Sequence, residues 1–130
     1  MNAKLAVVIA GVMTPLAVAP LFAHHSFAAT SFEDQRATIQ GTLVEFVYRS
    51  PHSFVTVDVT EPATHELVRW TVEWASNNRL GREGVNADTL KPGDQVTILG
   101  HPGRTAGEHR LHMWGIARPS DGWKWGHAID

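Results

Sequence analysis

Eight histidines stand out in this sequence of 130 residues, which contains no cysteine. All eight follow the apolar N-terminal segment, and His24 and His25 come directly after it. A histidine at the start of a chain offers two nitrogen ligands, the α-amine and the imidazole, and one more imidazole completes a T-shaped set of three. Imidazole and amine nitrogens suit Cu(II) in tetragonal geometry. The histidines therefore predict a metal site, with copper as the first candidate.

Four histidines are the candidate ligands: His24, His52, His101 and His109. His24 would supply two nitrogens and His52 the third, with His101 or His109 completing or flanking the site. Zinc is disfavoured because no acidic or cysteine ligand recurs at a zinc-like spacing. Met113 is the only methionine beyond the N-terminal segment, so a Cu(I) site of methionine sulfurs is not supported.

The other four histidines are interpreted as ordinary polar residues. His25 belongs to a polar arm, His65 to a turn and His127 to the tail, where imidazoles are solvated. His112 alternates with apolar neighbours in a predicted strand, so we expect it to face outward as a strand residue rather than to bind a metal. Histidine is the commonest metal ligand, yet it has many other roles.

Residues 1–23 are typical of a signal peptide. Lys4 gives a charged start, segment 5–19 is uncharged and almost wholly apolar, and small residues follow. A spanning helix needs about 20 apolar residues, so the protein would meet a membrane only through an uncleaved signal. Cleavage after Ala23 is preferred and makes His24 the first residue. Cleavage after Ala28 fits the small-x-small rule better but would remove both leading histidines. The predicted location is periplasmic or secreted.

Length and charge restrict the function of the remaining chain. Its size predicts one domain, 36–130, preceded by an N-terminal arm, 24–35. Once Lys4 is removed, ten basic face thirteen acidic side chains, a net charge near −3 with neutral histidines. This lacks the basic character of a nucleic-acid-binding protein. No catalytic motif is present, so we do not expect an enzyme.

Alternating hydrophobicity indicates a mostly β domain. Five strands are predicted, at 36–48, 53–61, 67–74, 95–100 and 109–117. A short helix is expected within 75–90, a tight type II turn at 91–94 and a hairpin turn at 121–122. Residues predicted to face the core are Val55, Val57, Val59, Val68, Val72, Val96 and Ile98. Three strands, a helix and two strands are the order of a five-stranded Greek-key barrel of the OB type, whose long first strand serves both sheets.

Several short motifs also resemble a known family. They are His24-His25-Ser26-Phe27, Pro51-His52, an Asn-rich turn before Leu80, and Leu90-Lys91-Pro92-Gly93-Asp94. In this order they resemble small exported bacterial proteins of unknown function, the domain of unknown function 6152, over residues 24–117. His109, His112 and the tail 123–127 depart from that pattern. The resemblance implies export and a small β domain, and because the family has no established activity it leaves the function open.

A metal-free binding module is the alternative. Trp70 and Trp74 fall on the apolar face of the third strand and are expected in the core. Trp114, Trp123 and Trp125 crowd the C-terminal end, where they would form an exposed aromatic surface for a sugar, a peptide or a protein partner.

N-terminal sequencing of the protein from the cell envelope checks the predicted cleavage. We expect His24 as the first residue, because the apolar run ends at Ala23. A chain that starts at Ala29, or that keeps Met1, would remove the N-terminal histidine ligand.

Overall fold

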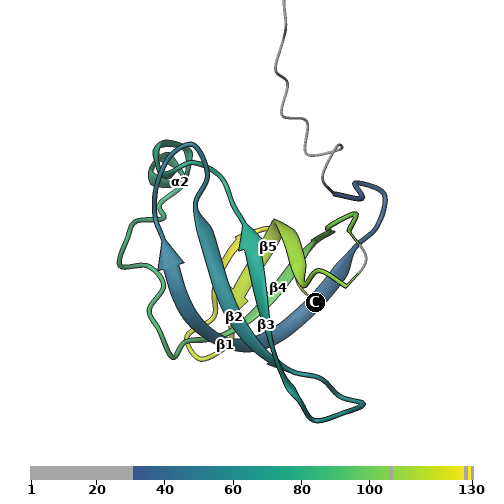
Figure 1. Ribbon diagram of the computed structural model, residues 1–130. Helices are drawn as coiled ribbons and strands as arrows, with labels where there is room; N and C mark the ends of the chain where they lie inside the picture. The colour runs from purple at the N-terminus through teal and green to yellow at the C-terminus, as the bar shows by residue number, and fades with distance from the viewer. Residues whose placement is uncertain (1–30, 106, 128, 130) are drawn as a thin grey trace, which may run out of the picture.

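A computed structural model describes residues 31–105, 107–127 and 129, which form a closed β-barrel with one helix (Figure 1). The strands are β1 (Ala37–Val47), β2 (Phe54–Thr60), β3 (Leu67–Glu73), β4 (Gln95–Pro102), β5 (Arg110–Arg118) and β6 (Trp123–Gly126), and the helix is α2 (Asn77–Arg82). The predicted signal peptide lies outside the described residues. None of the helical residues described forms a segment long and apolar enough to cross a bilayer.

The strand order is β3-β2-β1-β4-β5-β6, and a further parallel pairing of β3 with β5 closes the barrel. Helix α2 lies between β3 and β4 in the chain, as predicted. The five-stranded OB topology predicted from the sequence is therefore confirmed. Strand β6 is a sixth, short strand that the prediction did not count, and it pairs with β5 across the expected hairpin turn.

Strand β1 belongs to both halves of the barrel because it bends along its length, as Figure 1 shows. Its first half pairs with β4 and its second half with β2, and Thr42 has a partner in each, Gln95 and Asp58. Gly41 stands at this crossing. A Cβ atom there would collide with the carbonyl oxygen of Asp58, so only glycine allows the two strands to approach this closely.

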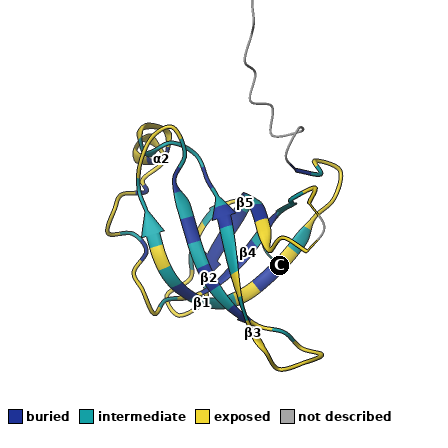
Figure 2. Ribbon diagram, in the orientation of Figure 1, coloured by how far each residue is buried: buried dark blue, intermediate teal, exposed yellow. Residues whose placement is uncertain are grey.

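The inward faces of the strands form the core, which Figure 2 shows as alternating buried positions along β2 and β5. Of the seven residues predicted inward, six are buried and Val68 is half-buried. Trp74 is 1% exposed, whereas Trp70 is only half-buried.

Helix α2 lies against the β1–β2 end of the barrel (Figure 1). Ser76 caps it by accepting a hydrogen bond from the backbone N–H of Arg79. The Tyr48 hydroxyl lies 2.9 Å from the carbonyl oxygen of Asn77 and 3.0 Å from that of Val85. Leu80 is fully buried. The helix is therefore held in place by the buried side chain of Leu80 and by the hydroxyl of Tyr48, the residue that follows β1.

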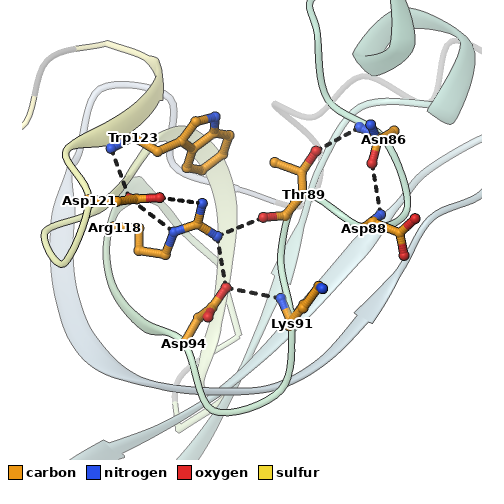
Figure 3. Close-up of polar contacts among 8 residues, drawn as sticks. All are labelled: Asn86, Asp88, Thr89, Lys91, Asp94, Arg118, Asp121 and Trp123. Atoms are coloured by element: carbon orange, nitrogen blue, oxygen red, sulfur yellow. Dashed lines mark hydrogen bonds and ion pairs between the residues drawn. The ribbon is translucent and has the colours of Figure 1, made fainter.

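Arg118 joins two connections, the segment between α2 and β4 and the turn between β5 and β6 (Figure 3). Its guanidinium donates to Asp94 at 2.9 Å, to the Thr89 carbonyl at 2.7 Å and to Asp121 at 2.9 Å. Asp94 ends the predicted type II turn, whose Gly93 has a φ of 96° and whose closing bond to Lys91 measures 3.0 Å. Arg118 thus fastens this turn to the β5–β6 turn.

Arg118→Ala should lower the free energy of unfolding by about 2 kcal/mol, because it leaves two carboxylates without their charged donor. The side chain of Arg118 is only 17% exposed, so water replaces it poorly. Urea unfolding of the variant measures the loss. Lys124→Ala, at an exposed β6 position, is the matched control and should change stability little. Equal stabilities of the two variants would contradict the structural role of Arg118.

Candidate functional site

Closure of the barrel places three polar residues side by side across its outer surface. Glu73 on β3 is the Cα partner of His112 on β5, and His112 is the Cα partner of His101 on β4. The residue before Glu73 and the residue before His112 are both buried. Because successive side chains of a strand point to opposite faces, Glu73 and His112 point outward. The result is a lateral row of one carboxylate and two imidazoles from three strands.

His52 joins this row from the β1–β2 loop. Its Nδ1 lies 3.4 Å from Glu73 Oε1, and the two side chains are 34% and 26% exposed. The His101 and His112 rings are stacked with centroids 6.3 Å apart. We call His52, Glu73, His101 and His112 the histidine cluster.

The hydrogen bonding of His101 defines its tautomer. Its Nδ1 lies 2.9 Å from the carbonyl oxygen of Gln35. A carbonyl oxygen only accepts, so Nδ1 carries the hydrogen and Nε2 carries a lone pair when the ring is neutral. A metal-binding histidine commonly donates its second ring N–H to a backbone carbonyl or carboxylate in this way.

His112 has the most altered electrostatics in the cluster. Its pKa is lowered to about 4, mainly because burial disfavours the charged ring and also because His101, His52 and Arg79 act in the same direction. The ring is therefore neutral at neutral pH. A neutral imidazole keeps a nitrogen lone pair, which can bind a metal or accept a hydrogen bond.

The structure places the predicted ligands in different parts of the molecule. His52 and His101 lie in the histidine cluster, and His24 lies outside the described residues. His109 lies elsewhere, with its ring edge against Trp70 at 5.0 Å. Trp70 occupies the face of β3 opposite that of Glu73, so His109 is separated from the cluster by the sheet.

His112 was not a predicted ligand, although it does face outward as expected. The alternation of β5 gave the direction of its side chain, but its neighbours come from non-sequential strands. In the described part of the chain, no three His, Asp or Glu side chains are arranged to hold a metal ion. A metal site here needs a further ligand.

The C-terminal tryptophans do not form the exposed surface that the sequence predicted, because each is half-buried against partners. Trp114 has the Arg36 guanidinium 3.2 Å from its ring centroid and the His127 ring at 4.1 Å. His127 was expected to be solvated and is an exposed residue, although its ring contacts Trp114. Trp125 contacts Trp74 edge-on at 4.9 Å.

A cleft of about 730 Å³ adjoins the histidine cluster. Trp74, Trp114 and Trp125 line it together with Arg79 and Glu83 of the α2 segment, and His52 and His112 belong to both the cleft and the cluster. We call it the tryptophan cleft. It lies between the helix and the β5–β6 hairpin.

Comparison with known families gives a match to a family whose function is unknown. The model of a family of unknown function, DUF6152, matches residues 12–112. No curated protein matches the sequence.

Two solved structures are similar to part of this chain at low identity and with TM-scores below 0.5. A mutant of TiaS lacking its ZRD, in complex with agmatine, is 14% identical over 65% of this chain, with a TM-score of 0.47. The chain covers 21% of that structure's length. Rim1, a mitochondrial single-stranded DNA binding protein from S. cerevisiae, is 11% identical over 63% of this chain and 90% of its own, with a TM-score of 0.46. These likenesses concern the fold alone.

The lowered pKa of His112 predicts an acid-dependent loss of stability. Its folded-state pKa is about 4 and its ordinary value is 6.5, so the unfolded chain binds more protons between these values. The contribution of the neutral His112 ring to the free energy of unfolding is present above pH 6.5 and is lost as the pH falls towards 4. His112→Gln should therefore lose less thermal stability than the wild type over this window.

His65→Asn is the control for that comparison. His65 is exposed in a turn with a φ of 59°, a conformation that asparagine tolerates. We expect its melting temperature to follow the wild-type pH profile. If the His112→Gln profile does so too, the pKa of His112 is not lowered in the folded protein.

Proposed function

This chain belongs to the DUF6152 family, and we propose that it is an exported protein that binds a copper ion at the histidine cluster. In this proposal His24 supplies its α-amine and imidazole nitrogens, His52 a third and His112 a fourth, with His101 flanking them. The observation that carries it is the position of Glu73, a carboxylate that contacts His52 and is the strand neighbour of His112.

Glu73 and Gln35 supply the contacts that orient metal-binding imidazoles. The Glu73 carboxylate faces Nδ1 of His52, and the Gln35 carbonyl accepts from Nδ1 of His101. In both rings Nε2 is the nitrogen directed away from that contact. Such outer contacts fix ring orientation and raise ligand basicity, so they support a nitrogen-ligated metal.

The start of the described chain supports participation of His24. Ser31 is buried and pairs with Gly103, two residues beyond His101. Ser31 and Glu73 line the same hollow of about 300 Å³. His24 is seven positions before Ser31, a reach of about 23 Å at ~3.3 Å per residue. Measured from Ser31, this reach supports the participation of His24 in the cluster.

Nitrogen ligands favour copper over the other metals considered. Four amine and imidazole nitrogens match the tetragonal geometry of Cu(II). The chain has no cysteine, and the described residues provide no set of three ligands without His24. The site therefore depends on signal cleavage after Ala23, which makes the amine of His24 available only to the exported protein.

Copper titration of processed protein that begins at His24 tests this function. His52→Ala should weaken binding strongly by removing a ligand. Glu73→Gln should weaken it about tenfold, because it alters only the outer contact. One glycine added before His24 should also weaken binding, since it moves the amine away from the imidazole.

His65→Asn is the matched control, a histidine substitution at an exposed turn. We expect unchanged affinity and an unchanged electron paramagnetic resonance spectrum of bound Cu(II). Equal affinity in all variants would reject the histidine cluster as the copper site.

A further inference from the structure

The tryptophan cleft has the size and lining of a small-molecule site. Its volume of about 730 Å³ lies within the range of about 300–1,000 Å³ typical of ligand pockets. Trp114 on β5 and Trp125 on β6 are half-buried and supply apolar surface to the cleft, and the buried Trp74 lies behind Trp125, which it contacts edge-on. Flat aromatic walls favour flat aromatic ligands, which gain stacking or edge contacts beyond area burial.

One wall of the cleft is held in place by a polar network between β6 and α2. Trp125 Nε1 donates to Glu83 Oε2 at 2.8 Å, and Arg79 Nε donates to Glu83 Oε1 at 3.0 Å. Trp125 also packs edge-on against Trp74. Because the wall is already ordered, a ligand would not have to arrange these side chains itself.

Trp74 contributes an enclosed hydrogen-bond donor. It is 1% exposed, and its Nε1 has no acceptor among the described residues. A buried donor without an acceptor destabilises the folded protein. Because this nitrogen is enclosed, it belongs to the wall behind Trp125 and does not itself contact a ligand in the cleft.

The charges of the cleft favour an anionic acceptor group. Glu83 is the only carboxylate among the lining residues, and both of its oxygens are already engaged. Arg79 is 59% exposed, and within the described residues its two terminal nitrogens make no hydrogen bond. A guanidinium fork matches a carboxylate with two parallel hydrogen bonds.

We propose that the tryptophan cleft binds a planar aromatic carboxylate, with its ring against Trp114 and Trp125 and its carboxylate on Arg79. This site goes beyond the proposed copper function and does not require a metal. The cleft shares His52 and His112 with the histidine cluster, so the two ligands would lie next to each other.

Calorimetric titration of chelator-treated protein from the cell envelope tests the proposal with 2-naphthoate as the probe. We expect saturable binding of one molecule, with 2-naphthamide, the neutral analogue of the same shape, binding about tenfold more weakly. The indole N–H signal of Trp125, which lines the cleft and donates to Glu83, should shift on titration.

Arg79→Gln should weaken 2-naphthoate binding about tenfold and bring the two probes to similar affinities. Arg82→Gln is the matched control, since Arg82 lies on the same helix, is exposed and does not line the cleft. Ala75→Leu, which adds side-chain volume to the lining, should weaken both probes and covers the case in which Arg79→Gln disturbs the helix. Absence of saturable binding, or full affinity in Arg79→Gln and Ala75→Leu, would overturn the proposal.

Discussion

The parallel pairing of β3 with β5 is the constraint on which the rest of this structure depends. It is short, joining Thr71 to Arg110, Val72 to Leu111 and Glu73 to His112. It nevertheless converts an open sheet into a barrel and covers part of the exposed edge of β3. The same three pairs bury Val72 and Leu111 inside and place Glu73 beside His112 outside. The same strand pairing therefore positions both core residues and residues of the histidine cluster.

This closure requires a first strand that can serve both halves of the barrel. Glycine at position 41 permits the close approach of β1 to β2, and the register shift between Leu43 and Glu45 bends the strand further. Arg118 then fastens the turn before β4 to the turn after β5. The glycine and the bulge in β1, together with the ion pairs of Arg118, thus help to determine where strands distant in the sequence meet.

In the histidine cluster and the tryptophan cleft, several residues act by orienting the rings of their neighbours. Glu73 and Gln35 contact imidazoles through their ring nitrogens, and Glu83 holds an indole of the neighbouring cleft. These supporting groups come from β3, from the arm and from the segment after α2. A metal at the cluster and an aromatic ligand in the cleft would each meet side chains that are already oriented, which reduces the entropy lost on binding.

The sequence by itself determined the local features of this protein. Alternating apolar residues specify strands and their inward faces, and Pro92-Gly93 specifies a type II turn, because each depends on neighbours close in the chain. The order of the elements was enough to predict an OB barrel, and the outward direction of His112 followed from alternation.

Only the tertiary structure decided which histidines meet. His109 and His112 are three residues apart, yet His109 packs on Trp70 and His112 joins His52, Glu73 and His101. The same holds for the C-terminal tryptophans, whose covering partners come from distant segments. The physical reason is that strand register and barrel closure set these neighbours, and periodicity along one strand carries no information about the residue beside it on the next.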